Sequence, residues 1–248
     1  MIDDVLRLSP RIVALPVLHG NGDFAIAVRR LMAKERFDCV AVPLPPTFQA
    51  DVEAAIDRLP AISLVVQRSS PWAPGSGELG SGSGADPDAD GTVSYVPVDP
   101  CQAVIAALRS ALEERVPRAF VDLETDPFMP YAAVFPDAYA LKRVPLSRFV
   151  SALLPSLPPL PQGQPTQRVE TMAARLRELE GRFRSILFVS SLLDWPWVRQ
   201  AYLRETSPFE DDPVEPTAVY EPSAASLYFV LGELPYITGL YERARRKL

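Results

Sequence analysis

Histidine, cysteine and long hydrophobic runs are scarce in this chain, and each scarcity excludes a class of protein. The 248 residues include a single histidine, His19, so a zinc site made of several histidines is excluded. The two cysteines, Cys39 and Cys101, lack metal-ligand spacing and suggest no disulfide framework, which favours a reducing compartment. No stretch approaches the roughly 18 consecutive apolar residues of a membrane span. We therefore expect a cytoplasmic protein without a membrane span.

Basic residues are also fewer than acidic residues. The chain has 25 lysines and arginines against 31 aspartates and glutamates, which gives a net charge of −6 and a pI near 5.0. A protein that binds nucleic acid needs a basic surface to displace counterions, so we expect no nucleic-acid partner. The basic run at the C-terminal end, YERARRKL, is short and is typical of a solvated helix end.

The chain does contain short apolar runs separated by segments with helical spacing. The first three apolar runs, 11–18, 39–44 and 61–68, have the length and β-branched content of buried strands. Segments 23–37 and 48–60 lie between them and have the apolar spacing of helices, the first with Asp23 as its expected N-cap. Strands that alternate with helices in this way are typical of a parallel sheet.

The same alternation continues to the C-terminal part of the chain. Further strands are predicted at 92–98, 118–124 and 185–191, and amphipathic helices at 101–116 and 166–183, where Asp99 and Pro100 are expected to begin the first of these two helices. We predict a single α/β domain over residues 1–248, with a mostly parallel sheet of about six strands and helices on both faces. The charged run at its end carries no stop signal, so this domain is also interpreted as the N-terminal part of a longer protein.

One segment departs from the pattern. Residues 73–91 are rich in Gly, Ser and Asp and contain almost no apolar side chains. Such a segment cannot bury enough surface to offset the entropy of ordering it. We predict a flexible insertion, with a mobile lid as the functional alternative.

Polar side chains stand where three predicted strands end. His19 follows the first strand, Asp122 and Glu124 end the strand at 118–124, and Asp194 follows the strand at 185–191. Ligands of parallel α/β sheets bind at the carboxyl ends of the strands, so these residues form the candidate site. The alternative is structural: His19 bonds to a loop carbonyl, and the acids cap helices. Neither a phosphate-binding glycine loop nor a GxSxG nucleophile motif is present.

Three segments of the chain resemble the TraB/TIKI and erythromycin esterase/ChaN-like superfamily. The opening unit is ALPVLHGNGDFAIAVRRLMAKERFDCVAVPL, the middle segment is CQAVIAALRSALEERVPRAFVDLE, and the closing unit is VETMAARLRELEGRFRSILFVSSLLDWPWV. The resemblance rests on element order and short motifs. It implies metal-dependent proteolysis or ester hydrolysis, or haem binding as in one branch, at a site made of a first His, a Glu of the second strand and a last His.

Carried over position by position, this implied site is altered. His19 matches the first His, Pro43 occupies the position of the Glu, and Asp194 occupies that of the last His, while Asp122 or Glu124 could replace the middle acid. One His with several carboxylates would favour Mg²⁺ or Mn²⁺ over Zn²⁺.

Three functions follow as hypotheses. The leading one is a catalytically degenerate TraB/ChaN-like domain that acts as a binding or scaffolding module in a larger bacterial protein or assembly. Its apolar tail 226–242 would then contact a protein partner. The alternative is a metal-dependent hydrolase with His19 and Asp194 as catalytic residues and His19, Asp122, Glu124 and Asp194 holding Mn²⁺ or Mg²⁺. The third is haem or small-ligand binding with His19 as the axial ligand.

Overall fold

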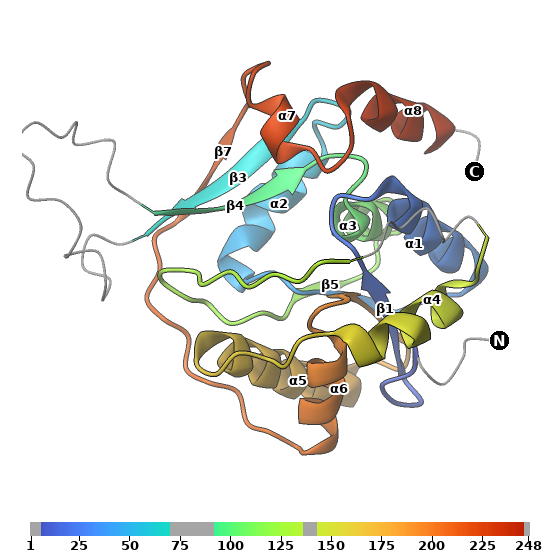
Figure 1. Ribbon diagram of the computed structural model, residues 1–248, viewed down its shortest axis with the longest axis vertical. Coiled ribbons are helices and arrows are strands. Elements are labelled where there is room, and N and C mark those ends of the chain that lie inside the picture. The colour runs from blue at the N-terminus through green and yellow to red at the C-terminus, as the bar shows by residue number, and fades with distance from the viewer. Residues whose placement is uncertain (1–5, 70–91, 136–142, 246–248) are drawn as a thin grey trace, which may run out of the picture.

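A computed structural model describes residues 6–69, 92–135 and 143–245 of the chain (Figure 1). The predicted insertion at 73–91 lies outside the described residues, so that prediction is not tested. Among the helices of the described part, none is both long and apolar enough to cross a membrane.

Within the described residues, a four-stranded parallel sheet forms the centre of the fold. Its strand order is β1-β6-β2-β5, with bounds Ile12–Val17 (β1), Ile186–Ser191 (β6), Cys39–Val42 (β2) and Arg118–Phe120 (β5). All residues of β1 and β2 are buried, and so are all of β6 except its last. Burial of consecutive residues requires cover on both faces of the sheet. The predicted strands at 11–18, 39–44 and 185–191 are therefore confirmed.

Helices supply that cover on both sides of the sheet. Helices α1 (Gly22–Lys34) and α3 (Ala103–Glu114) pack together on one side, and α5 (Gln164–Arg182) and α6 (Trp195–Leu203) pack together on the other (Figure 1). Two shorter helices, α2 (Gln49–Ile56) and α4 (Leu146–Leu153), complete the layers. The predicted α/β class, with a mostly parallel sheet between helices, is confirmed.

The predicted size of that sheet is wrong, because the third predicted strand belongs elsewhere. Strand β3 (Ser63–Arg68) pairs antiparallel with β4 (Val93–Val98) and with β7 (Thr217–Tyr220), which forms a second sheet in the order β4-β3-β7. The run Leu64-Val65-Val66 is as apolar as a strand covered on both faces, but Val65 is buried whereas its two neighbours are only half-buried. An apolar run alone does not distinguish one-sided from two-sided cover.

Two helices also begin differently from the prediction. Asn21, and not Asp23, caps α1, because its side chain accepts a hydrogen bond from the main-chain N of Asp23 at 3.0 Å. Helix α3 begins at Ala103, whereas Asp99 accepts from the main-chain N of Cys101 at 2.7 Å and so stabilises the turn before the helix.

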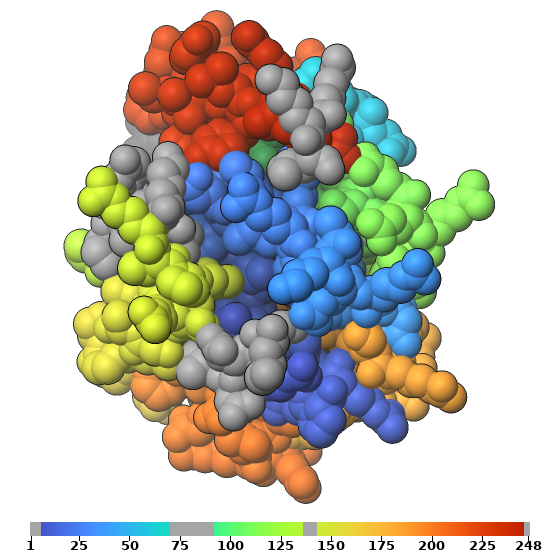
Figure 2. Space-filling model, turned by 90° about the vertical axis from the view of Figure 1, so that its right-hand side faces the viewer, coloured from blue at the N-terminus to red at the C-terminus, as the bar shows by residue number. Residues whose placement is uncertain are grey.

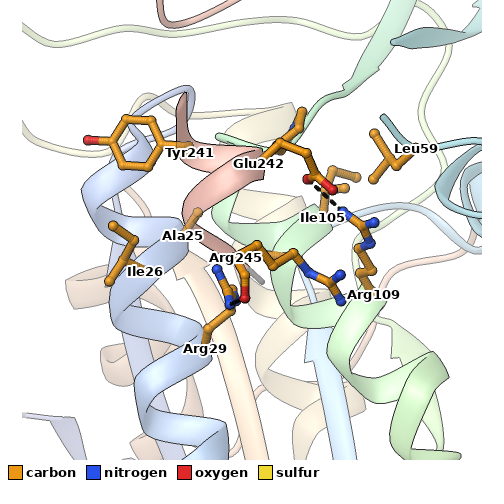
Figure 3. A pocket seen from close by; sticks show the side chains of 11 residues that line it. Ala25, Ile26, Arg29, Leu59, Ile105, Arg109, Tyr241, Glu242 and Arg245 are labelled. Carbon is orange, nitrogen blue, oxygen red and sulfur yellow. Dashed lines mark hydrogen bonds and ion pairs between the residues drawn. The ribbon is translucent and has the colours of Figure 1, made fainter. Parts of the chain in front are cut away.

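The C-terminal helix α8 (Pro235–Arg245), which follows the short helix α7 (Leu227–Val230), lies against the first helix of the chain. Figure 2 shows the surface of this C-terminal segment directly above that of α1. Figure 3 shows the contact from close by: Glu242 of α8 forms an ion pair with Arg109 of α3 at 2.8 Å. Arg29 of α1 donates to the main-chain O of Arg245 at 2.8 Å, which satisfies a carbonyl at the end of α8.

The loop before α8 approaches the loop after β1 very closely. A Cβ atom placed on Gly232 would lie 2.2 Å from the Cα of Gly20, a distance that no side chain tolerates. Gly20 itself has a φ of +74°, in the region that favours glycine. Because Gly20 directly follows His19, the C-terminal segment helps to hold the loop that carries the histidine.

Candidate functional site

A cavity of about 440 Å³ lies where the strands of the parallel sheet end. His19, Pro43 and Asp122, which follow β1, β2 and β5, line it. The start of α3 and all of residues 93–97 in β4 form two further walls, and Arg168 of α5 completes the lining. The predicted location of the site, at the carboxyl ends of parallel strands, thus coincides with a real cavity.

A buried ion pair lies at one end of this cavity. The Nε atom of Arg168 is 3.1 Å from both carboxylate oxygens of Asp122, and Nη2 also donates to Oδ2. Asp122 is 1% exposed and Arg168 is 9% exposed, so the pair is shielded from water. The ring of Phe128 lies 4.5 Å from the guanidinium carbon of Arg168. The bidentate contact and the ring together fix the guanidinium plane.

The remaining edge of that guanidinium is not satisfied. No described residue accepts a hydrogen bond from Nη1 of Arg168, although Nε and Nη2 are both engaged. Burial opposes the charge of Arg168, but Asp122 and, after it, Asp194 raise its pKa above the usual value. The cavity is therefore lined by a permanently charged group whose Nη1 atom, with two N–H donors, bonds to no described residue.

Asp194 lies next to this pair. The hydroxyl of Tyr131 donates to its Oδ1 atom. Burial raises the pKa of Asp194, while Arg168 and the Tyr131 hydrogen bond oppose this shift in part. Asp194 occupies the N-cap position of α6, yet its side chain makes no capping hydrogen bond. Its alternative role as a helix cap is thus not observed.

His19 borders the cavity with an accessible side chain. Neither of its ring nitrogens bonds to a described residue. The protein around the ring removes enough water to lower the pKa of His19, and the positive charge of Arg168 lowers it further. The imidazole is consequently neutral at pH 7 and can donate one hydrogen bond and accept another.

Glu124 is separated from these residues. Its Oε1 atom accepts from the main-chain N of Thr47 at 2.6 Å and from the Thr47 hydroxyl at 2.7 Å, and Glu124 does not line the cavity. These bonds tie it to a short 3-10 helix at Pro46–Phe48. Glu124 thus fixes the loop after β2.

The four residues predicted to hold a metal do not gather around one point. His19, Asp122 and Asp194 all interact electrostatically with Arg168 or lie against it, and Glu124 is directed at Thr47. In the described part of the chain, no group of three or more His, Cys, Asp or Glu side chains could hold a metal ion. The predicted Mg²⁺ or Mn²⁺ site gains no support from this arrangement, because Arg168 engages both carboxylate oxygens of Asp122.

Both cysteines are buried and free. Burial raises the pKa of the Cys39 and Cys101 thiols to about 12, so neither is a thiolate nucleophile at neutral pH.

Sequence reasoning missed Arg168, which lines the cavity, and Tyr131, which bonds to Asp194. Arg168 did leave a signal, because it lies four residues before Met172 and eight before Leu176, on the buried face of the predicted helix. A charged residue on an apolar face requires a buried partner. Tyr131 follows a proline-rich stretch and left no periodic signal at all.

The chain matches no protein-family model, and comparisons with curated proteins and with solved structures find no match either. The resemblance to the TraB/ChaN-like superfamily therefore stays a prediction, and the function must be argued from the cavity itself.

Proposed function

We propose that the protein is a binding module whose cavity holds a ligand that combines apolar groups with a hydrogen-bond acceptor for Arg168. The observation that carries this proposal is the free Nη1 donor of Arg168 beside a cavity of about 440 Å³. Arg168 lines the cavity and its Nη1 bonds to no described residue, so a ligand oxygen in the cavity would give this charged donor a partner.

The composition of the walls supports an apolar body for this ligand. Leu44, Phe48, Val104 and Ile105 contribute hydrocarbon surface, together with several prolines. Ligand sites commonly combine such walls with a few well-placed polar groups. Because Asp122 already balances the charge of Arg168, the head group needs an acceptor oxygen but no full negative charge.

The same geometry favours binding over metal-dependent hydrolysis. Asp122 has both oxygens engaged by Arg168, so using it as a metal ligand would strip the arginine of its partner. Pro43 lines the cavity at the position where the family resemblance implies a catalytic acid. A degenerate TraB/ChaN-like domain is consistent with both features.

Two fluorescent probes test the proposal with a matched pair of ligands. Anilinonaphthalene sulfonate has an apolar body and an acceptor head, and phenylnaphthylamine has the same body without the head. We expect the sulfonate to bind roughly 10- to 150-fold more tightly, because a hydrogen bond to a charged group contributes about 1.5–3 kcal/mol. Leu44→Trp should fill the cavity and abolish binding. Leu203→Trp, at an exposed position of α6, should leave it unchanged.

Equal binding of both probes by all three proteins would contradict the proposal, because the probes would then lie outside the cavity. Tight binding of phenylnaphthylamine alone would retain an apolar cavity but refute the role of Arg168.

A protein partner is the second candidate, and one observation favours it. Five large apolar side chains of the C-terminal segment are exposed: Tyr228, Phe229, Leu234, Tyr236 and Leu240. Exposed apolar groups that cluster in this way are typical of contact surfaces. If they contact a second copy of the chain, the joint replacement Phe229→Ser and Tyr236→Ser should abolish self-association in sedimentation. A monomer before and after the replacement would refute contact between copies.

A further inference from the structure

Strand β4 is one of the two outer strands of the antiparallel sheet and borders the cavity. Figure 1 shows the order β7, β3, β4 from the upper left of the molecule towards its centre. On one side β4 pairs with β3, and on its other side no described residue pairs with its main chain.

The register shows which main-chain groups are free. Leu64 pairs with Pro97, and since proline has no N–H group, this pair cannot be one that exchanges hydrogen bonds. Pairs alternate along an antiparallel ladder, so Ser94 and Val96 bond to β3. Val93 and Tyr95 therefore direct both N–H and C=O away from β3, towards the free edge.

That free edge faces the cavity. All five consecutive residues 93–97 line it. A cavity on one face of a strand would be lined by alternate residues only, because successive side chains point to opposite faces. Contact with every residue in turn indicates that the cavity runs along the edge of β4.

We infer that the ligand of this cavity is a short extended peptide segment that adds to the free edge of β4 as a further strand. The inference rests on the proposed binding function and specifies the ligand class. Val93 and Tyr95 offer a donor and an acceptor each at a two-residue spacing, which another extended main chain matches. The edge spans roughly 16 Å at about 3.3 Å per residue, enough for about four or five peptide residues. A carbonyl or carboxylate of the peptide then accepts from Nη1 of Arg168.

A single strand fits this edge better than a second copy of the protein does. Thr125, Phe128 and Pro130 line the cavity as well as β4. With these residues beside it, the edge has less room for a whole second sheet than for a single strand.

Amide exchange measured by NMR on the full chain tests the inference. The probe is a soluble hexapeptide with three Thr-Val repeats, an acetylated N-terminus and a free carboxylate, because main-chain recognition tolerates many sequences. At about 90% occupancy, exchange of the Val93 and Tyr95 amides should slow about tenfold. The amides of Ser94 and Val96, already bonded to β3, are the internal control and should not change.

A pair of variants separates main-chain pairing from side-chain contact. Tyr95→Pro removes an N–H group from the free edge of β4, a strand that already contains Pro97. This variant should abolish the peptide-induced slowing of amide exchange at Val93. Tyr95→Ala removes the same side chain but keeps the N–H group, and should preserve the slowing.

Two results would overturn the inference. One is unchanged exchange with up to about 5 mM peptide, a concentration that detects millimolar affinity. The other is slow exchange of Val93 and Tyr95 without peptide, which would mean that a different segment or a second copy occupies the edge. If the wild type binds the sulfonate and Leu44→Trp does not, while amide exchange is unchanged by the peptide, only the inference that the ligand is a peptide is refuted. If the sulfonate does not bind, the proposed function fails.

Discussion

Replacing Arg168 with methionine should destabilise the fold strongly. The replacement leaves the Asp122 carboxylate, which is 1% exposed, without its bidentate partner. Breaking a buried ion pair from one side costs about 3–5 kcal/mol, because an uncompensated charge stays buried. Loss of the contact between Arg168 and the Phe128 ring acts in the same direction. Urea unfolding should therefore show a free energy of unfolding lower by about 3–5 kcal/mol.

The double variant Asp122→Leu with Arg168→Met supplies the decisive comparison. It removes both charges and leaves apolar side chains, a change that is often close to neutral. The double variant should thus be more stable than Arg168→Met alone. Arg199→Met, at an exposed position of α6, is the control and should change stability by less than about 0.5 kcal/mol. A loss below about 1 kcal/mol for Arg168→Met would refute the buried pair.

Three other predictions follow from the same structure. The imidazole of His19 should titrate by NMR with a pKa below 6.5. As the pH falls, the unfolded chain then takes up this proton before the folded protein does, so the free energy of unfolding should decrease below about pH 6.5. The variant His19→Asn should show a smaller decrease. A midpoint at 6.5 or above would refute the desolvation of His19. Burial raises the pKa of Asp194 in the folded state, so the wild type gains stability relative to Asp194→Asn as the pH falls. The variant should therefore be the more stable protein at about pH 7, and the difference in the free energy of unfolding should vanish near pH 4. A difference that does not change with pH would contradict this prediction. Gly232→Ala should lower the free energy of unfolding by about 1–3 kcal/mol and speed amide exchange in α8, because the added methyl group collides with Gly20; unchanged exchange there would show that the two loops do not touch.

Three strands of the parallel sheet, β1, β2 and β6, were predictable because they are apolar over most of their length. Phe188 and its neighbours in β6 are fully buried, as two-sided cover requires. The second sheet was not predictable in the same way. Its strand β3 contains an equally apolar run, and β7 pairs with it from a position about 150 residues further along the chain. Local pattern contains no information on such distant pairing.

The candidate site was predictable in location but not in chemistry. His19, Asp122 and Asp194 do lie near the same edge, since parallel strands end together. Which partner each side chain takes depends on a helix that arrives much later in the chain. Arg168 reaches Asp122 from α5 and thereby turns a set of possible metal ligands into an ion pair.

The most direct test of the binding function uses the only histidine as a reporter. His19 borders the cavity, so its imidazole resonances in a ¹³C-labelled sample should shift when anilinonaphthalene sulfonate is added, and saturate at one probe per chain. The same addition to Leu44→Trp should leave those resonances in place. If the probe fluoresces in the presence of the wild type while the His19 resonances do not move, the probe binds elsewhere and the proposed binding site is wrong.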